Sequence, residues 1–333
     1  MVKMCNTERR LPRIALTMGD AAGIGPELLI KAIDAEEFKD RAEFILYGEK
    51  TVLQKSFELY GNKTLKFNEL QIRETSNLLS ADTLPIGTPD PNCGIAAYEA
   101  VKTAAIDAVN GKIDAIVTAP INKYSVNLAG IKFSGHTELI AEIYNCSDFA
   151  MMQSSGKLHV AFVTTHIPIA DVAKSITFDR VLQVAELLYQ VLMDEGVTNP
   201  KLAIMALNPH AGENGCMGDE DERITRKVIE YLRSKNIDIA DMQVPDVIFA
   251  NGNYQKYDGI VSMYHDQGHI PFKMLAFSSG VNSTLGLPII RCSPDHGSAF
   301  DIAWQNRADT GSFFAAITSA IKRANSKQTR NAE

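Results

Sequence analysis

The sequence predicts an α/β protein: a three-layer fold with a mostly parallel β-sheet covered by helices on both faces. Apolar runs of strand length alternate along the chain with stretches whose apolar residues follow helical spacing. Polar and charged residues follow directly after several of these runs, where ligands bind in open α/β sheets. The 333 residues, 45% of them hydrophobic and 22% charged, suffice for one large domain or two interlocked ones.

The composition indicates which kinds of molecule the protein binds and where it is located. A formal net charge of −7 argues against a nucleic-acid-binding protein, since such binding depends on clustered Lys and Arg. Five scattered cysteines without a C-x-x-C pair suit reduced thiols. The start of the chain, a polar leader, has no apolar signal region, and no run approaches the roughly 18 apolar residues of a spanning helix. We therefore expect a cytoplasmic protein with no membrane contact.

The first element is a strand at residues 14–17, followed by a glycine-rich turn at 18–25. Pro26 suits the first turn of a helix because its missing N–H costs nothing there, and helical spacing continues to residue 38. The glycines do not fall as G-x-G-x-x-G. Dinucleotide binding and a simple tight turn both remain open for this segment.

The rest of the first half contains two further strands. An Ala-rich amphipathic helix is closed by Asn110-Gly111, in the manner of left-handed helix caps. Lys123 follows the strand after this helix, so a polar group reaches a strand end there too. The predicted elements are strands at 43–47 and 113–118, helices at 50–60 and 95–109, and a mixed region at 62–92 that ends in a loop.

The second half continues the alternation. Gly135-His136-Thr137 precedes a helix within residues 131–146, with Thr137 as a candidate N-cap; a helix start of this kind is a natural anion site, although His136 could equally be an ordinary loop residue. Two further apolar runs lie at 259–264 and 286–290, so that His265 and Arg291 come at strand ends. The other predicted elements are strands at 158–165 and 202–207, and helices at 177–195, 221–234 and 310–324.

Three histidines each follow a separate hydrophobic strand. They are His166, His210 and His265, and the first 135 residues contain no histidine. A single histidine in such a place is more often structural, but three at equivalent positions favour a shared metal site. Imidazole suits Zn, Co, Ni or Fe better than Mg or Ca, and three protein ligands leave a coordination position open for substrate. His159 and His269 are less well placed, inside a strand and in a loop.

Positive groups indicate the kind of substrate. Arg offers a planar fork to a phosphate or carboxylate, and Lys offers a point charge. Each of these residues alone is more often a surface charge, whereas the group as a whole favours an acidic metabolite. The group comprises Lys123, Lys273 and Arg291, accompanied by Asn282, His136 and Thr137.

Eight sequence blocks resemble one family. They are TMGDAAGIGPE, VTAPINK, FSGHTE, VTTHIPI, LNPHAGENG, MYHDQGHIPFK, GVNSTLGLPIIR and DHGSAFDIA. Together, in this order across residues 17–303, they resemble the 4-hydroxythreonine-4-phosphate dehydrogenase family, including its 4-phospho-D-threonate and 4-phospho-D-erythronate dehydrogenase branch. The sequence HDQGHIP resembles the phospho-threonate branch more than the vitamin B6 branch.

The resemblance implies a homodimer with an isocitrate/isopropylmalate dehydrogenase-like fold and an active-site cleft shared between subunits. Two interlocked domains are expected. A cofactor-side domain would comprise residues 1–130 and about 270–333, and a metal-binding and dimerisation domain would comprise about 131–269.

The resemblance also implies roles for single residues. A divalent metal (Zn, Co, Mn or Mg) would be held by His166, His210 and His265, the last from the partner chain. The remaining implied residues are His136, Thr137, Lys273, Asn282 and Arg291 for substrate, Asp295, His296, Gly297 and Asp301 for the nicotinamide cofactor, and Asp266 and Lys273 for proton transfer.

The implied reaction is oxidation of a secondary alcohol β to a carboxylate, with hydride transfer to NAD or NADP. A metal at the alcohol would lower its pKa and stabilise the enolate formed when the β-keto acid loses CO2. The substrate would be 4-hydroxy-L-threonine 4-phosphate, as in pyridoxal phosphate biosynthesis, or 4-phospho-D-threonate or 4-phospho-D-erythronate.

Three departures from the family pattern affect this interpretation. Ala21 stands where the family usually has proline, Cys216 where a histidine is common, and 304–307 (WQNR) where a glycine-containing run is usual. The last change touches the implied cofactor loop. Two alternatives therefore stay open: a zinc hydrolase that uses the three histidines, and a phosphometabolite-binding protein without turnover.

Overall fold

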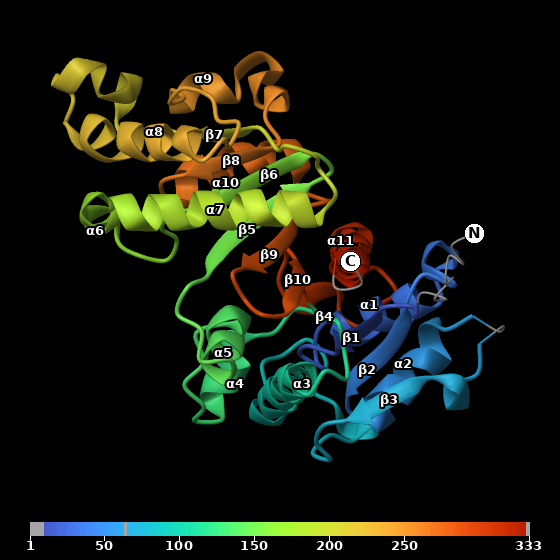
Figure 1. Cartoon of the computed structure of the whole chain (residues 1–333). Coiled ribbons are helices and arrows are strands. Elements are labelled where there is room, and N and C mark those ends of the chain that lie inside the picture. Colours follow the sequence, from blue (N-terminus) through green and yellow to red (C-terminus); the bar gives the residue numbers. More distant parts are fainter. Residues whose placement is uncertain (1–9, 63–64, 331–333) are drawn as a thin grey trace, which may run out of the picture.

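A single ten-stranded sheet forms the centre of the molecule in the computed structural model, which describes residues 10–62 and 65–330. Most of the predicted polar leader, with Cys5, lies outside the described residues. Figure 1 shows the strands following one another from β7 at one end to β3 at the other, with helices on both faces. The predicted α/β class and mostly parallel sheet are confirmed.

The strand order across the sheet is β3-β2-β1-β4-β10-β9-β5-β6-β8-β7. The strands are β1 (Arg13–Thr17), β2 (Glu43–Gly48), β3 (Gln71–Glu74), β4 (Ala115–Thr118), β5 (Ala150–Ser155), β6 (Leu158–Phe162), β7 (Leu202–Ile204), β8 (Gly259–Ser262), β9 (Val281–Leu285) and β10 (Ile290–Pro294).

Strand direction divides the sheet into two parallel blocks. β3, β2, β1, β4 and β10 are parallel to one another, and so are β6, β8 and β7. Between the blocks, β10–β9, β9–β5 and β5–β6 are antiparallel pairs. These three reversals make β4 antiparallel to β8. The expectation that Lys123 and His265 follow strand ends at one common edge is therefore wrong, whereas β6, β7 and β8 do share an edge.

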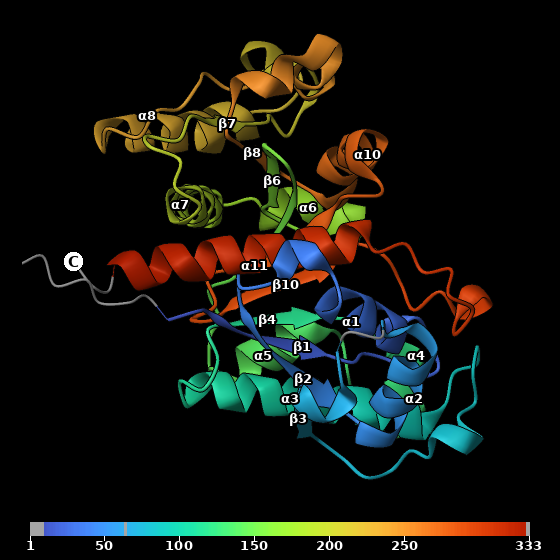
Figure 2. The same ribbon diagram turned by 90° about the vertical axis from the view of Figure 1, so that its right-hand side faces the viewer.

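The helices cover both faces, and the last one joins the two blocks. Figure 2 shows α11 crossing the middle of the molecule, with α7 on one side and β1 to β4 on the other. Its Phe313, Ile317 and Ile321 pack in one core with Ile14 and Leu16 of β1. The helices are α1 (Gly25–Ile33), α2 (Lys50–Tyr60), α3 (Pro91–Val109), α4 (Lys123–Leu128), α5 (His136–Ile143), α6 (Ile169–Ser175), α7 (Phe178–Asp194), α8 (Arg226–Ser234), α9 (Pro245–Ile248), α10 (His265–Ala276) and α11 (Gly311–Arg330).

The glycine-rich turn after β1 packs directly on the loop after β4. Gly19 has φ +69°, and a side chain there would collide with the carbonyl of Pro120. The amide of Asp20 donates a hydrogen bond to that carbonyl, 2.9 Å away. The Asp20 carboxylate then accepts from the Ser125 hydroxyl in α4. This packing supports the start of α4, where Lys123 lies.

Several local expectations were wrong. The run 286–290 is mostly the loop between β9 and β10, so Arg291 lies inside a strand rather than at its end. Thr137 does not cap α5; Gly135 is the N-cap, and the Thr137 hydroxyl instead lies 2.9 Å from that of Thr284. His269 lies in α10, not in a loop.

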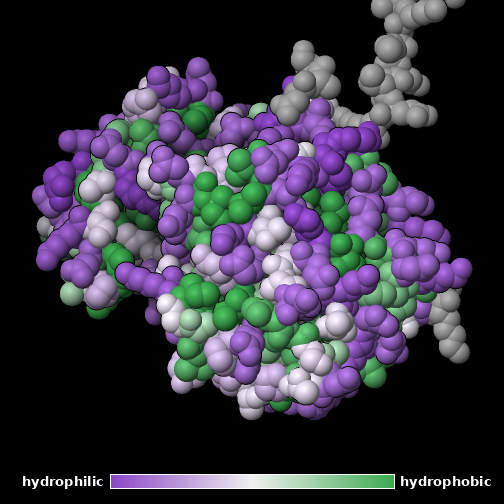
Figure 3. Space-filling view, turned by 90° about the horizontal axis from the view of Figure 1, so that it is seen from below, coloured by the Kyte–Doolittle hydropathy of each residue, from purple (hydrophilic) through white to green (hydrophobic). Residues whose placement is uncertain are grey.

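The face of the molecule seen from below is mostly hydrophilic (Figure 3). Seen from below, separate hydrophobic patches are interrupted by hydrophilic residues (Figure 3). Among the helices formed by residues 10–62 and 65–330, none has the length and apolar character needed to cross a membrane.

Candidate active site

Most of the predicted substrate and cofactor residues line one cavity of about 590 Å³. α5 contributes His136 and Thr137, α10 contributes Lys273, and the neighbouring strands β9 and β10 contribute Asn282 and Arg291. The predicted convergence of these five residues is therefore found in the structure. The other lining residues are Lys123, Gly135, Glu138, Met151, His166, Phe277, Ser293, Pro294, Asp295, His296 and Gly297.

Arg291 is a buried cation in the wall of this cavity, with only 4% of its surface exposed. Its Nη2 donates to the Thr118 hydroxyl at 2.9 Å and its Nη1 to the Asn282 side-chain oxygen at 3.5 Å. Its Nε has no hydrogen-bond partner among the described residues. Burial lowers the pKa of Arg291 to about 10, so the guanidinium remains charged at neutral pH. A buried charge of this kind calls for an anion.

His136 lies near Arg291 with an open nitrogen. Burial, and then the charges of Arg291 and Lys123, hold the pKa of His136 well below its ordinary value, so the ring is neutral. Its Nε2 is buried without a partner in the part of the chain that the structure describes. A neutral imidazole can donate or accept there according to its tautomer. His136 and Arg291 both line the cavity, and each has one buried nitrogen without a partner in the described residues.

Lys273 reaches the cavity from α10 and is held by an acidic neighbour. Its Nζ lies 3.4 Å from Oδ2 of Asp295, and Gln153 donates to Oδ1 of the same carboxylate at 3.0 Å. The carboxylate of Asp295, a predicted cofactor contact, is thus already engaged in orienting Lys273. Of the other predicted cofactor residues, His296 and Gly297 line the cavity, whereas Asp301 is exposed in the short turn Phe300–Ile302 and does not.

A second cavity of about 330 Å³ adjoins the first, and His166 lines both. The rings of His166 and His265 lie 5.7 Å apart within the same chain. Nδ1 of His265 is 2.7 Å from the carboxylate of Asp266, which leaves Nε2 of His265 as the free nitrogen. Burial, followed by Lys123 and His265, lowers the pKa of His166. Both rings therefore suit metal coordination.

His210 is not brought to this pair. It lies in the turn Pro209–Gly215 with φ +52°, and its side chain is 63% exposed and 3.6 Å from the carboxylate of Glu213. Within the described residues of one chain, no group of three or more His, Cys, Asp or Glu side chains is arranged to hold a metal. The three predicted ligands are thus not assembled in one chain.

Trp304, in the run that departs from the family pattern, contacts the glycine-rich turn. The residue adopts φ +61°, and its indole N–H donates to the carbonyl of Ala21 at 2.9 Å. The 304–307 run and the turn at residues 18–25 are therefore held together near the predicted cofactor loop. At Gly297, an added side chain would meet nothing within 4 Å, so the backbone there is open to a ligand.

Sequence reasoning missed residues that act through others. Thr118 holds Arg291, and Gln153 holds the carboxylate of Asp295, which in turn holds Lys273. Nothing in the linear pattern links Thr118 to a residue 173 positions away. Gln153 is a buried polar residue on β5, a strand that has a neighbouring strand on each side. A buried polar side chain needs a hydrogen-bond partner, and this requirement is the signal that could have identified Gln153.

Comparisons with known proteins show the family of this chain. The model of the family "Pyridoxal phosphate biosynthetic protein PdxA" matches residues 40–320. A 4-hydroxythreonine-4-phosphate dehydrogenase from Desulforapulum autotrophicum is 39% identical over 94% of this chain and 96% of its own. A D-threonate 4-phosphate dehydrogenase from Pectobacterium atrosepticum is 39% identical over 93% of this chain and 99% of its own.

The fold is shared as well. The crystal structure of 4-hydroxythreonine-4-phosphate dehydrogenase from Klebsiella pneumoniae superposes with a TM-score of 0.82 at 35% identity, covering 96% of this chain and 99% of that one. Sequence and structure agree over nearly the whole length. The chain belongs to the PdxA family of pyridoxal phosphate biosynthetic proteins.

Proposed function

We propose that this protein is a dehydrogenase that oxidises a phosphorylated hydroxy acid. Relatives with 39% identity are named 4-hydroxythreonine-4-phosphate dehydrogenase and D-threonate 4-phosphate dehydrogenase, and we propose a substrate of this class. The observation that carries the proposal is the cavity lined by buried Arg291 and neutral His136, each of which has a buried nitrogen without a partner among the described residues. Lys123 adds positive charge to the same walls.

The substrate's two anionic groups suit different parts of this cavity. We assign its phosphate to Arg291, His136 and Thr137, where a guanidinium and two neutral groups at the start of α5 converge. Asn282 would hold a substrate hydroxyl. Lys273 would transfer the proton, because it lines the cavity itself. Asp266, the other predicted candidate, lines the adjoining cavity and contacts His265 instead.

A divalent metal fits the pair His166 and His265. The supporting observations are the 5.7 Å separation of the two rings and the Asp266 contact that leaves Nε2 of His265 free. The resemblance implied that His265 comes from the partner chain, but His166 and His265 lie together in one chain. We therefore propose that His210, which is exposed and distant from the pair, is the ligand that a second subunit supplies. Such a metal would act as a Lewis acid at the substrate's alcohol.

A nicotinamide cofactor, NAD or NADP, would approach the cavity at His296 and Gly297. The open backbone at Gly297 supports this assignment. In the proposed reaction the alcohol carbon would give a hydride to the nicotinamide, and the hydroxyl would give its proton to the unprotonated amine of Lys273, which becomes the cation that Asp295 faces. The β-keto acid would then lose CO2, the bonding electron pair would pass to the α-carbon, and Lys273 would return its proton to this carbon.

A homodimer is part of the proposal. Large apolar side chains on and just after α10 are exposed: Ile270 (58%), Met274 (82%), Leu275 (48%) and Phe277 (79%). An exposed group of this kind is typical of an interface. It continues directly into the candidate site, since Phe277 lines the cavity. We keep the division into two interlocked, isocitrate dehydrogenase-like domains as part of this proposal.

The test follows NADH or NADPH absorbance with each phosphorylated candidate, after chelation and after adding Zn, Co, Mn or Mg. We expect that one of the substrates supports reduction of NAD or NADP. A chelator should stop this reduction, and an added metal should restore it. Turnover that survives complete chelation would contradict the metal assignment. Absence of reduction with any substrate, in protein that binds metal, would instead favour the hydrolase or binding-protein alternatives.

A further inference from the structure

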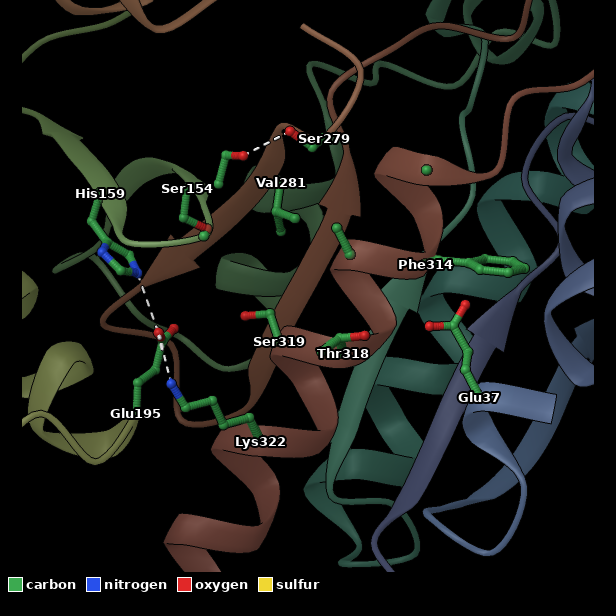
Figure 4. A pocket seen from close by; sticks show the side chains of 14 residues that line it. Glu37, Ser154, His159, Glu195, Ser279, Val281, Phe314, Thr318, Ser319 and Lys322 are labelled. Carbon is green, nitrogen blue, oxygen red and sulfur yellow. Dashed lines mark hydrogen bonds and ion pairs between the residues drawn. The ribbon is translucent and has the colours of Figure 1, made fainter. Parts of the chain in front are cut away.

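Another cavity, of about 430 Å³ and lined largely by polar residues, lies on the other face of the sheet from the candidate active site. We call it the opposite-face cavity. It shares no lining residue with the site cavity. Figure 4 shows it between the β5–β6 hairpin and α11, with Glu195 and Lys322 at one end. Its lining residues are Glu37, Ser154, Ser155, Gly156, His159, Glu195, Ser279, Val281, Gly311, Phe314, Ala315, Thr318, Ser319 and Lys322.

Strand register explains why the two cavities lie back to back. Ser154 of β5 pairs with His159 of β6 and with Val281 of β9, so these three side chains share one face. The next pair along, Gln153 and Asn282, points to the opposite face, toward the candidate site. Each strand therefore alternates between the two cavities.

One end of the cavity carries an excess of positive charge. His159 lies between two acceptors, the carbonyl of Asp258 (Nδ1, 3.0 Å) and the carboxylate of Glu195 (Nε2, 3.2 Å). Both contacts are satisfied only when each ring nitrogen carries hydrogen, as in an imidazolium cation. Lys322 lies 3.9 Å from the same carboxylate. Figure 4 shows Glu195 between the two cations.

A third cation lies behind this end. Arg323 is 4% exposed, and its Nε has no hydrogen-bond partner among residues 10–62 and 65–330. Burial alone would raise the pKa of the Glu195 carboxyl, but His159, Arg323 and Lys322 together lower it. At this end of the cavity one carboxylate thus faces three basic groups. The other lining carboxylate, Glu37, lies at the opposite end, beside Phe314 (Figure 4).

Lys322 is the basic group that a ligand can reach. Its side chain is 54% exposed, and the Glu195 contact at 3.9 Å is too long for a hydrogen bond. All its N–H donors are therefore available to an incoming anion. A carboxylate bound there would offset the excess charge at low cost, because Glu195 keeps its closer partner, His159.

The remaining walls offer hydroxyls and an aromatic ring. The hydroxyls of Ser154 and Thr318 have no hydrogen-bond partner in the described part of the chain, although Ser154 is only 6% exposed. Ser319 adds a third hydroxyl near Lys322, and Phe314 adds an apolar ring (Figure 4). Unpaired hydroxyls beside an apolar ring suit a ligand that has both O–H and C–H groups.

We propose that this cavity binds a small polyhydroxy monocarboxylate, of the sugar-acid class, with its carboxylate on Lys322 and its hydroxyls on Ser154, Thr318 and Ser319. One reachable cation matches a single negative charge. The proposal does not depend on the chemistry at the other cavity, because the two sites share no residue.

The test is methyl NMR on the full-length protein with gluconate as the probe. Val281 lines the opposite-face cavity and Met151 lines the candidate active site, so their methyl signals report the two sites separately. We expect saturable shifts at Val281, and weaker or no shifts at Met151 over the same range. Sorbitol, which has the hydroxyls without the charge, and acetate, which has the charge without the hydroxyls, should each bind at least about tenfold more weakly.

Variants localise the effect. Lys322→Met should weaken gluconate binding at Val281 about tenfold or more, because it removes a charge-assisted hydrogen bond. Lys322→Arg should retain binding, and Lys227→Met, which removes a positive charge from the exposed surface of α8, should change nothing. The proposal is overturned if gluconate leaves Val281 unmoved, if Lys322→Met binds like the unaltered protein, or if sorbitol binds as well as gluconate.

Discussion

The hydroxyl of Thr118 accepts a hydrogen bond from Nη2 of Arg291 across two adjacent parallel strands, at 2.9 Å. This contact fixes the orientation of a buried guanidinium whose other hydrogen bond, among residues 10–62 and 65–330, is to Asn282 at 3.5 Å. Its Nε is buried and has no partner in that part of the chain. The arrangement makes Arg291 the anchor for an anionic group and Thr118 its support.

Replacing Arg291 should lower catalytic efficiency more than replacing Thr118, which only orients it. Arg291→Met should lower kcat/KM for the phosphorylated substrate about 100-fold, since it removes charge-assisted hydrogen bonds to the phosphate. Thr118→Val should lower it about tenfold, through misplacement of the guanidinium. Steady-state kinetics measures both, and equal losses in the two variants would contradict the division of roles.

Asp20 should limit stability at neutral pH. Its carboxylate is fully buried, and burial raises its pKa to about 6 from 3.8, although Ser125 and the amide of Ala22 oppose the shift. Between these two pH values the folded state keeps a proton that the unfolded state releases, so the free energy of unfolding falls as pH rises. Above pH 6 the loss is complete, at about 3 kcal/mol.

The variant Asp20→Asn keeps the acceptor for Ala22 and removes the charge. Its free energy of unfolding should exceed that of the unaltered protein by about 1–3 kcal/mol at pH 7.5, with the difference shrinking toward pH 4. Urea denaturation at a series of pH values measures this. A pH-independent difference would mean that the carboxyl is not the cause.

His210 should contribute to metal binding although it is exposed. His210→Ala should reduce the metal content of the purified protein and leave its subunit assembly intact. Elemental analysis together with light scattering measures both properties. His159→Gln is the matched control, because this histidine lies in β6 and contacts Glu195, away from the proposed ligands. Unchanged metal content in His210→Ala would refute the assignment.

The apolar side chains of α10 should hold two subunits together. Met274, the most exposed of them at 82%, should tolerate Asp within one chain but not in an apolar interface. Met274→Asp should therefore shift the protein from dimer toward monomer in sedimentation. Leu59→Asp, at an exposed apolar position on α2, should not. Equal behaviour of the two variants would place the interface elsewhere.

Elements with a clear pattern of apolar residues were predicted from the sequence, and elements without one were missed. The helix at 50–60 and the strand at 43–47 were found almost to the residue, because their apolar positions are clear. β5 and β9 read AMMQSS and VNSTL and were missed, since both carry polar residues toward the cavities on the two faces of the sheet. A buried strand with polar side chains on both faces has no apolar signature.

The site was predictable where residues contact a ligand and hidden where they contact each other. Arg291, His136 and Lys273 carry their chemistry in their residue type. Gln153 supports Lys273 by binding Asp295, a residue 142 positions later in the chain, and only the folded chain shows this. Helix α10 was hidden because it contains Pro271 and Gly268; a side chain at Gly268 would lie 2.7 Å from the Phe162 ring.

The insertion of β10 between β4 and β9, with α11 packed behind it, affects how the chain can mature on the ribosome. Strands β1 to β4 emerge early, yet their core stays open until Phe313, Ile317 and Ile321 have been synthesised. At the usual 5–20 residues per second, the more than 170 residues between β4 and β10 take about 10–35 seconds to translate. The amino-terminal apolar surface is therefore exposed for that interval, and we expect chaperones to bind the nascent chain there.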